Sequence, residues 1–557
     1  MDKIRPTRKA EQIAITISSR RIFTLYRVES THSYSPRQST LGQGQTRVTS
    51  NAMLPMERRQ DEFAAAKEKQ QQPPHFLIVT YPAQGHITPA RHLARRLVYA
   101  ADGGEARVTI CMPVSAFRKM FPEATAAGAD GEEMIEDEGG IAYAAYSDGY
   151  DGGFDRATDD YARYMSQVRL EGARTLSGLL RRLGDRGRPV TCAVYTLLLP
   201  WVAAVAREHG VATVAVFWIQ PATALAAYYH YFRGSRDAVV AAAASRDPTA
   251  EVRIPGLPPL MFRDLPSFLA VTSDDDPFAC AITEFRELID ALERDGDSGK
   301  PPTYVLANTF DAMERDALAS LRPHVEVITV GPVLSFLHGG DNGESPNDLF
   351  EHDTAEYLHW LDTMPAKSVV YISFGSTSVM SKTQVAEIAV AMKQADKPFL
   401  WVLRKNNCRE QGDDDAIKKL LAAATGGGGG KVVEWCDQAR VLSHPSVGCF
   451  VTHCGWNSTL ESVACGVPTV AVPQYSDQGT NAWLVDRVLG VGVRAAARSE
   501  DGVLEARELT RCVEVAMSEA VTARAGDWKE KARAAVADGG ASDRSLRKFV
   551  RRIASGS

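Results

Sequence analysis

The sequence lacks an uninterrupted apolar stretch of about 18 residues and a secretory signal pattern, so we expect no integral membrane segment. Its nine cysteines are an odd number, with no C-x-x-C pair and no zinc-ligand spacing. Several stand in apolar segments, where cysteine behaves as a small buried hydrophobic residue. These absences argue against a disulfide framework and a structural zinc site, and they predict a cytoplasmic protein with free thiols.

A strong excess of charge of one sign is also missing. The formal net charge is −6 over 557 residues, with +7 on residues 1–60 and −13 on the remainder. Proteins bind nucleic acids through clustered Lys and Arg, so the acidic body makes DNA or RNA an unsuitable partner. The length exceeds what one hydrophobic core supports, and we therefore expect two domains.

Two common phosphate-binding motifs are absent. Neither G-x-G-x-x-G after a strand nor G-x-x-x-x-G-K-[ST] occurs in the chain. This argues against a dinucleotide-binding site and against a P-loop. Without a dinucleotide-binding site, a nicotinamide oxidoreductase is also not expected. An anion-binding site in this protein must be built in another way.

The first 72 residues differ from the rest of the chain. They are rich in Arg, Ser and Thr, contain few large apolar residues, and end in the polar tract 67–74. Such a segment cannot bury enough apolar surface to offset its ordering entropy, which predicts a disordered extension over residues 1–72. Two alternatives stay open: the same bias is typical of an organellar transit peptide, and translation could begin at Met53 or Met56.

From residue 73 onward, apolar runs of strand length alternate with helix-like stretches such as 201–208. The runs are 76–81, 107–111, 190–195, 212–217, 368–374, 399–403, 448–452 and 468–472. Continuous apolar runs are typical of strands buried on both faces, and their alternation with helices predicts parallel sheets. We therefore predict an α/β fold of two tandem Rossmann-like, doubly wound domains that face each other across a cleft.

The domain boundaries follow from breaks in this alternation. The pattern stops at Gly331-Pro332, and residues 338–353 are rich in Gly, Asn and Asp. We place an N-terminal domain at 73–332, a linker at 333–354, a C-terminal domain at 355–535, and a final helix at 536–557 that packs back on the N-terminal domain. The glycine run 426–430 predicts a flexible surface loop.

Two junctions between a strand and a helix carry candidate site residues. After the first strand, Thr88 and Pro89 fit an N-cap and a first helical residue. In the second half, Ser458 and Glu461 fit the S-x-x-E capping box, so a helix is expected to begin near Ser458. The positive dipole end of that helix faces the strand tip, where it can bind phosphate.

A long block of the second half matches a known signature. Residues 435–478 read WCDQARVLSHPSVGCFVTHCGWNSTLESVACGVPTVAVPQYSDQ. This block closely resembles the plant secondary product glycosyltransferase box, the donor-binding signature of UDP-sugar-dependent glycosyltransferases with the two-domain GT-B fold. The resemblance covers most of residues 75–550, including HFLIVTYPAQGHITPA at 75–90, NTFDAME at 308–314 and SFGST at 373–377. It implies an acceptor-binding N-terminal domain and a UDP-sugar-binding C-terminal domain.

The resemblance also implies donor-binding roles. The residues it assigns to the donor site are Ser376, Trp435, Cys436, Gln438, His453, Trp456, Asn457, Ser458, Glu461, Asp477 and Gln478. Within this set Trp435 would stack on the uracil, and Gln438 with Glu461 would bond the ribose hydroxyls. The diphosphate would be held by Ser376, His453, Asn457 and Ser458, and the sugar by Asp477 and Gln478. Glutamine at the last position of the box favours UDP-glucose.

His86 is the candidate general base. It follows the first strand at the sheet edge, and imidazole is well matched to accept a proton from an acceptor hydroxyl. Many relatives carry an aspartate that hydrogen-bonds this histidine, but here Thr196 stands in the matching place. A threonine supplies no negative charge, so acceptors of low pKa, phenols and carboxylates, are expected rather than aliphatic alcohols.

The resemblance therefore predicts inverting transfer of glucose from UDP-glucose to a small lipophilic plant metabolite or hormone, giving a β-glucoside or a glucose ester. No metal or other cofactor is expected, because the helix dipole and polar groups would meet the diphosphate charge. We also expect a monomer whose partners are the acceptor and the UDP-sugar. The alternative is a UDP-sugar-binding protein whose catalysis is impaired because Thr196 replaces the aspartate.

Overall fold

The computed structural model describes residues 73–101, 106–123, 134–155, 158–273, 276, 278–293, 302–337, 354–376, 378–404, 414–426, 429–498 and 500–556. Residues Gln72–Arg498 and Val503–Ser557 form one compact unit. Of a second unit, Met1–Gln71 with Ser499–Gly502, the structure describes the turn at residues 500–502. The expected disordered extension and the Gly/Asn/Asp-rich part of the expected linker, residues 338–353, lie outside the described residues.

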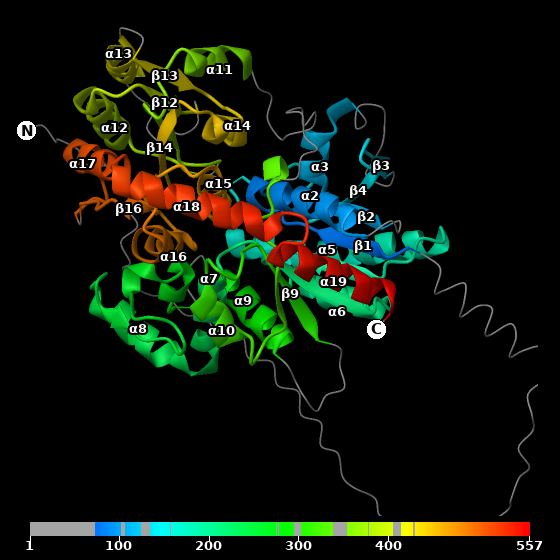
Figure 1. Ribbon diagram of the computed structural model, residues 1–557. Coiled ribbons are helices and arrows are strands. Elements are labelled where there is room, and N and C mark those ends of the chain that lie inside the picture. Colours follow the sequence, from blue (N-terminus) through cyan, green and yellow to red (C-terminus); the bar gives the residue numbers. More distant parts are fainter. Residues whose placement is uncertain are drawn as a thin grey trace, which may run out of the picture. The chain divides into compact units, whose positions relative to one another are not determined.

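The N-terminal half of the compact unit is built on an eight-stranded sheet (Figure 1). The strand order is β10-β9-β6-β5-β1-β2-β4-β3, parallel throughout except that β3 runs antiparallel to β4. Its strands are β1 His75–Val79, β2 Arg107–Pro113, β3 Ile135–Glu136, β4 Ile141–Tyr146, β5 Cys192–Tyr195, β6 Thr213–Trp218, β9 Thr303–Ala307 and β10 Val327–Thr329. Two short strands, β7 Glu251–Val252 and β8 Leu260–Met261, pair separately.

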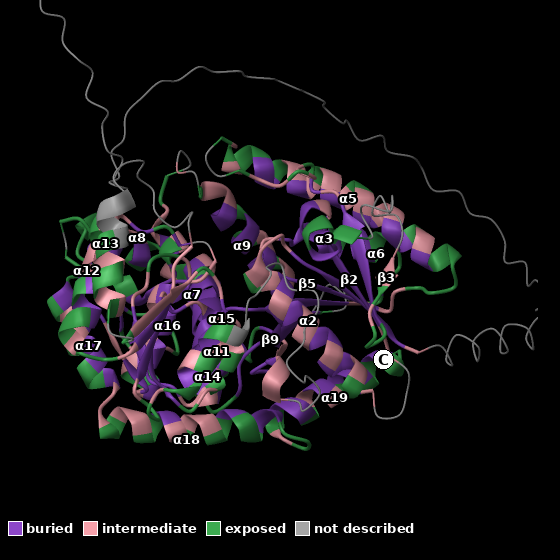
Figure 2. Ribbon diagram, turned by 90° about the horizontal axis from the view of Figure 1, so that it is seen from above, coloured by how far each residue is buried: buried purple, intermediate pink, exposed green. Residues whose placement is uncertain are grey.

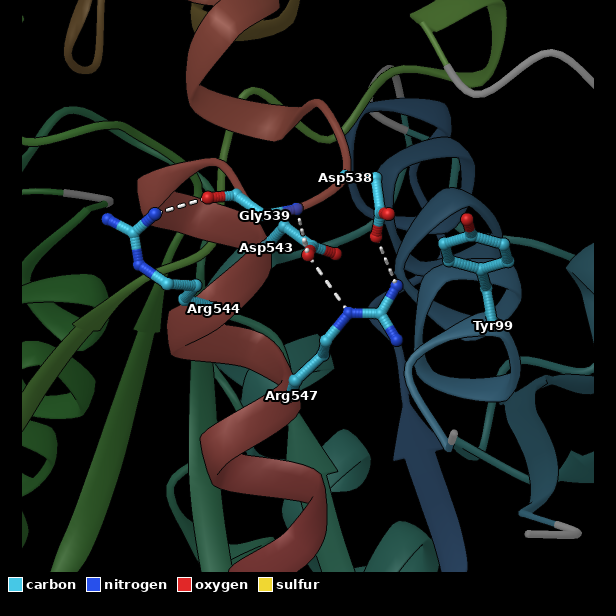
Figure 3. Close-up of a pocket in the computed structure, with 6 residues that line it drawn as sticks. All are labelled: Tyr99, Asp538, Gly539, Asp543, Arg544 and Arg547. Atoms are coloured by element: carbon cyan, nitrogen blue, oxygen red, sulfur yellow. Dashed lines mark hydrogen bonds and ion pairs between the residues drawn. The ribbon is translucent and has the colours of Figure 1, made fainter. Parts of the chain in front are cut away.

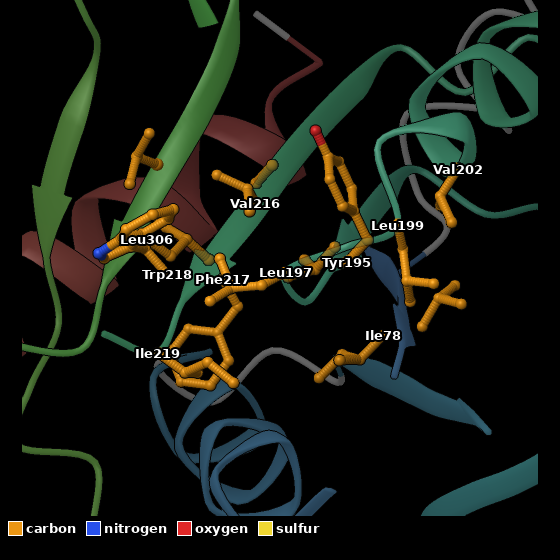
Figure 4. Packing of buried hydrophobic residues seen from close by; sticks show 14 of the residues in the cluster. Ile78, Tyr195, Leu197, Leu199, Val202, Val216, Phe217, Trp218, Ile219 and Leu306 are labelled. Carbon is orange, nitrogen blue, oxygen red and sulfur yellow. The ribbon is translucent and has the colours of Figure 1, made fainter. Parts of the chain in front are cut away.

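Helices cover this sheet, and the strands between them are buried (Figure 2). The helices of this half are α2 Gln84–Tyr99, α3 Val114–Met120, α5 Tyr161–Asp185, α6 Trp201–Glu208, α7 Ala222–His230, α8 Arg236–Ser245, α9 Ala279–Leu292 and α10 Arg315–Leu321. Figure 4 shows how side chains of neighbouring strands, Ile78, Val216 and Leu306 among them, fill the space against these helices. All three are fully buried, as a continuous apolar run requires.

The C-terminal half is built on a second, wholly parallel sheet of six strands in the order β13-β12-β11-β14-β15-β16. These strands are β11 Val369–Ser373, β12 Phe399–Val402, β13 Gly430–Val433, β14 Val447–Thr452, β15 Thr469–Ala471 and β16 Gly492–Arg494. Its helices are α11 Thr354–Asp362, α12 Lys382–Ala395, α13 Asp414–Thr425, α14 Gln438–Ser443, α15 Trp456–Cys465, α16 Gln478–Trp483, α17 Ala506–Ala516 and α18 Glu519–Val536. The two tandem doubly wound sheets confirm the predicted fold class.

Two local expectations were wrong. Helix α2 begins at Gln84 rather than at Thr88, with Ala83 as its N-cap, and Pro89 lies inside the helix. The glycine run was predicted as a loop up to Gly430, but Gly430 is the first residue of β13 and pairs with Phe399. A Cβ on Gly430 would lie 2.3 Å from the Phe399 ring, so this glycine serves close packing of the sheet.

The end of the chain returns to the N-terminal half. Helix α18 packs on α15, and the final helix α19, Ala541–Ala554, packs on α2 and β10. On α19 the buried Phe549 lies against Phe76 of β1 and Tyr304 of β9. Figure 3 shows the turn between α18 and α19, where Arg547 donates to Asp538 and Asp543.

Residues 264–267 of the N-terminal half form hydrogen bonds with the C-terminal half. The Asp264 carboxylate forms an ion pair with Arg494 of β16 at 2.5 Å. The backbone oxygen of Asp264 accepts from the Thr480 hydroxyl at 2.7 Å. The backbone N–H of Ser267 donates to Ser476 O, and the Ser267 hydroxyl accepts from Ser476 N–H, both at 2.7 Å. These bonds fix the loop that leads into α16.

Candidate active site

The predicted donor residues follow the strands of the C-terminal sheet. Ser376 comes three residues after β11, Trp435 two residues after β13, and His453 directly after β14. Because these strands are parallel, their carboxyl ends meet at one edge of the sheet. That edge is where ligands bind in open α/β folds.

His453 is held between two glycines. A Cβ on Gly375 would lie 2.7 Å from His453 Cε1, and a Cβ on Gly455 would lie 2.6 Å from His453 Nε2. Only glycine lets the backbone approach the ring this closely on both sides. Burial lowers the pKa of His453 to about 4, so the imidazole is neutral near pH 7.

The helix after His453 begins earlier than the capping pattern predicts. Gly455 is the N-cap of α15, and the first helical bond runs from Thr459 N–H to Gly455 O at 2.9 Å. The expected start near Ser458 was wrong, because the Glu461 side chain does not return to the helix start and is bonded to Gln438 instead. The helix itself supplies no acceptor for the N–H groups of residues 456–458, which stand at its positive dipole end.

Three of the predicted donor residues form one hydrogen-bonded cluster. Gln438 Nε2 donates to Glu461 Oε2 at 2.6 Å and to Ser458 Oγ at 2.8 Å. The Tyr371 hydroxyl donates to Gln438 Oε1 at 3.2 Å and so fixes the orientation of the amide. Burial raises the pKa of Glu461 to about 7, and its bond from Gln438 opposes this shift.

Trp435 is covered by a cation that the sequence analysis did not single out. The guanidinium carbon of Arg404 lies 4.5 Å from the centroid of the Trp435 ring, and Arg404 Nη1 donates to Ser376 O at 3.2 Å. Arg404 thus links the residues predicted to bind the base and the diphosphate. Its place two residues after β12, at the carboxyl edge of the sheet, is the signal that could have identified it.

The side chains of Trp456 and Cys436, two of the predicted donor contacts, point into the protein. Trp456 is 3% exposed, and its indole N–H donates to Asn308 O in the N-terminal half at 2.8 Å. The Cys436 thiol lies 3.3 Å from the Tyr371 hydroxyl, and burial raises its pKa to about 12. Both side chains contribute to packing, so only their backbone atoms remain for a donor.

The last two predicted donor residues lie at the start of α16. Gln478 Oε1 accepts from the N–H groups of Gln474 and Tyr475 at 2.8 and 3.1 Å, which leaves its amide nitrogen as the group to offer a ligand. Asp477 accepts from Asn481 Nδ2 at 2.9 Å, and burial raises its pKa to about 6. The neighbouring Ser476 is the residue fixed by Ser267.

His86 lies in the first turn of α2, and its partner is the expected one. His86 Nδ1 lies 2.9 Å from Thr196 Oγ1, and this oxygen also accepts from Tyr81 N–H at 3.2 Å. The Tyr81 ring centroid is 5.3 Å from that of His86. Burial lowers the pKa of His86 to about 3.

The two halves meet at the starts of α2 and α15. Asn457 Nδ2, in the first turn of α15, donates to Gly85 O in the first turn of α2 at 3.1 Å. Two helix N-termini therefore lie next to each other, each with the positive end of a helix dipole. Such a junction favours an anion.

Two searches of the described part of the chain gave no result. None of its helices has the length and apolar character needed to cross a membrane. Over residues 73–498 and 500–556, apart from the short gaps given above, no group of three His, Cys, Asp or Glu side chains is arranged to hold a metal ion.

Comparison with known proteins defines the class. Residues 347–513 match the family model of UDP-glucoronosyl and UDP-glucosyl transferases. The chain is 43% identical over 490 residues to UDP-glycosyltransferase 75C1 of Solanum lycopersicum, covering 86% of this chain and 98% of that protein. It is 40% identical over 490 residues to anthocyanidin 3-O-glucoside 5-O-glucosyltransferase 1 of Perilla frutescens, with the same coverage. The crystal structure of Os79 from O. sativa in complex with UDP superposes with a TM-score of 0.69 at 29% identity, covering 86% of this chain and 100% of that one.

These similarities, with the two parallel sheets, define a glycosyltransferase of the GT-B fold. The chain belongs to the plant UDP-glycosyltransferase family. It is therefore an enzyme that transfers glucose to small acceptors, and the expectation of this family from the sequence is confirmed.

The close approach of Gly375 to the His453 ring can be tested with a matched control variant. We expect Gly375→Ala to lower stability and weaken UDP binding, because the new methyl group overlaps the His453 ring and φ is +74° at this position. Gly187→Ala introduces the same backbone strain at φ +70° with nothing within 4 Å. The control should lose about 1–2 kcal/mol of unfolding free energy, and Gly375→Ala about 1–3 kcal/mol more.

Urea unfolding measures the stability of both variants, and calorimetry measures their affinity for UDP. If both variants lose the same stability and bind UDP as the parent enzyme does, the position of the His453 ring does not depend on Gly375.

Proposed function

We propose that the enzyme transfers glucose from UDP-glucose, with inversion at the anomeric carbon, to a phenolic hydroxyl or a carboxylate of a small lipophilic plant metabolite or hormone. The product would be a β-glucoside or a glucose ester. The observation that carries the proposal is the pairing of His86 with a threonine hydroxyl instead of a carboxylate.

A neutral partner makes His86 a weak base. The Thr196 hydroxyl cannot stabilise an imidazolium as an aspartate does, and burial lowers the pKa of His86 to about 3. Phenols have pKa values of about 10, and carboxylic acids of about 4 are already ionised at pH 7. These acceptors need less assistance than aliphatic alcohols, and a carboxylate needs no base at all.

The hydrogen bonds around Thr196 are compatible with the tautomer that a base requires. If His86 Nε2 accepts the proton of the acceptor, Nδ1 must carry a hydrogen and donate it to Thr196 Oγ1. That oxygen has two lone pairs, and it then accepts from both His86 and Tyr81 N–H. In this tautomer Thr196 holds the imidazole in place without charging it.

The donor would lie along the carboxyl edge of the C-terminal sheet. Trp435 would stack on uracil, and the Gln438–Glu461 pair would open to bond the ribose hydroxyls, because a carboxylate can accept from two neighbouring hydroxyls. Asp477 and the Gln478 amide would contact glucose. Arg404 adds a positive charge beside Trp435 that the family resemblance alone did not indicate.

The diphosphate would sit at the junction of α2 and α15. The groups that reach it are the α15 N–H groups, neutral His453, Asn457, Ser458 and Ser376. All of them can donate hydrogen bonds, and no carboxylate is among them, which is the chemistry of a direct anion site. We therefore propose that transfer proceeds without a metal or other cofactor, with UDP leaving as the acceptor oxygen attacks.

Two further expectations belong to the proposal. The eight described cysteines are free, and Cys111, Cys192, Cys436, Cys449, Cys454 and Cys512 are buried. Buried free thiols are typical of proteins in a reducing compartment, which supports a cytosolic location. The enzyme is proposed to act as a monomer.

A panel of acceptors with UDP-glucose tests the proposal. We expect UDP release with phenols and aromatic carboxylic acids at kcat/KM values at least tenfold above those with aliphatic alcohols. His86→Ala should lower turnover of phenols by roughly 10²–10⁴-fold and affect carboxylates much less, because only phenols require proton removal. Faster turnover of aliphatic alcohols, or UDP binding without turnover of any acceptor, would contradict the proposal.

Thr196→Asp sharpens this test through its pH dependence. The new carboxylate favours the imidazolium and raises the pKa of His86, so the neutral base is lost as pH falls through the raised value. The variant should gain activity on aliphatic alcohols and show an acid limb between pH 5 and 8 that the parent enzyme lacks. Thr196→Val is the control, since it removes the hydroxyl without adding charge.

Glu461→Gln should raise the stability of the enzyme at pH 8 and weaken its binding of UDP. A carboxyl group whose pKa is raised on folding, from 4.5 to about 7, destabilises the unliganded enzyme as pH rises through this interval. The amide variant should therefore be more stable at pH 8 by about 1–2 kcal/mol, with little change at pH 4.5. UDP should bind it roughly tenfold more weakly, because charge-assisted bonds to ribose are lost.

Thermal unfolding at the two pH values and UDP calorimetry provide both readouts. Exposed Glu530→Gln is the matched control and should change neither quantity. A loss of stability at pH 8, or unchanged UDP affinity, would refute the assigned role of Glu461.

A further inference from the structure

Helix α2 contains a proline where a helix normally has a backbone donor. Pro89 lies within α2, Gln84–Tyr99, four residues after Gly85. In a regular helix the N–H of residue 89 would bond to the carbonyl oxygen of residue 85, but proline has no N–H. The pyrrolidine ring also crowds that carbonyl and tilts it outward. Gly85 O is therefore left without its usual partner within the helix.

The other half of the protein uses this oxygen. Asn457 Nδ2 donates to Gly85 O at 3.1 Å, and the two residues are 372 positions apart in the chain. A Cβ built on Gly85 would lie 3.9 Å from Asn457 Nδ2, an ordinary van der Waals distance, so the bond does not depend on a glycine at this position. The bond joins the first turn of α2 to the first turn of α15.

Both ends of the bond lie next to residues of the reaction centre. Gly85 directly precedes His86, whose ring is held on its other side by Thr196. Asn457 lies between Trp456, anchored to Asn308 O, and Ser458, which is bonded to Gln438. A shift of either helix start would change the distance between His86 and the donor.

We propose that Pro89 is a positioning residue for glucosyl transfer: by removing one helical N–H, it reserves the Gly85 carbonyl for Asn457 and fixes the turn that carries His86 against the donor-binding helix. This inference rests on the proposed role of His86 as the base. Pro89 itself touches neither substrate, and its effect passes through Gly85 and Asn457.

Pro89→Ala tests the inference with two readouts that move in opposite directions. Alanine restores the N–H, whose helical bond would draw the Gly85 carbonyl toward the helix axis and away from Asn457, and it is a better helix former than proline. We expect a urea midpoint at or above that of the parent enzyme, kcat for a phenol lowered about five- to tenfold, and an unchanged Kd for UDP. Thr88→Ala, one residue earlier in the same helix, changes a side chain but no backbone donor and should leave kcat unchanged.

A double-mutant comparison assigns the effect to the bond. In an Asn457→Ala background the partner of Gly85 O is absent, so adding Pro89→Ala should lower kcat less than twofold further. An unchanged kcat in Pro89→Ala, a loss of kcat that accompanies a lowered urea midpoint, or full additivity with Asn457→Ala would overturn the inference.

The same assays separate this inference from the proposed function. If the parent enzyme glucosylates phenols and His86→Ala abolishes this activity, an unchanged Pro89→Ala refutes only the positioning role. If His86→Ala is as active as the parent enzyme, both the base assignment and the role of Pro89 are refuted.

Discussion

The contact between the first turns of α2 and α15 is the constraint on which the site depends. Both turns expose the positive end of a helix dipole, and Asn457 holds them together at Gly85. Two like dipole ends at close range are unfavourable until an anion lies between them. The diphosphate of a UDP-sugar, at the site proposed beside His86, would supply this negative charge without the lysine of a P-loop.

Burial around this junction shifts the pKa of each titratable group toward its neutral form. It lowers the pKa of His86 and His453 to about 3 and 4, and raises that of Glu461 and Asp477 to about 7 and 6. Both imidazoles are therefore neutral at pH 7, which avoids the cost of burying two positive charges. Gln438 bonds to Glu461, which is predicted to bind the ribose, and Arg404 lies over Trp435, which is predicted to stack on the base.

The sequence predicted the fold better than it predicted the local geometry of the site. Long apolar runs such as 76–81 identify buried parallel strands because burial on both faces leaves little alternative. Helix starts were less predictable: the patterns at Thr88 and Ser458 assume a side-chain cap, whereas the actual N-caps, Ala83 and Gly455, make no side-chain cap bond.

The side-chain contacts of the site show the same division. The family resemblance indicated the pairing of His86 with Thr196, because it puts Thr196 in the place of the aspartate that bonds this histidine in many relatives. The position of Arg404 after β12 could have placed it at the sheet edge, but not over the Trp435 ring. The burial of the Trp456 ring could not be predicted, because its partner Asn308 lies 148 positions away in the chain. Sequence patterns and the family resemblance locate the candidate site. The packing of the folded chain decides which atoms of each residue are left to contact a ligand.

The protonation state of His86 is the most direct test of the proposal that His86 is a neutral base held by Thr196. Nitrogen-15 NMR of the imidazole groups with UDP bound, assigned by comparison with His86→Gln, reports which ring nitrogen carries hydrogen. We expect a neutral ring from pH 5.5 to 8 with hydrogen on Nδ1, donated to Thr196. An imidazolium at pH 6, or a neutral ring with hydrogen only on Nε2, would contradict it.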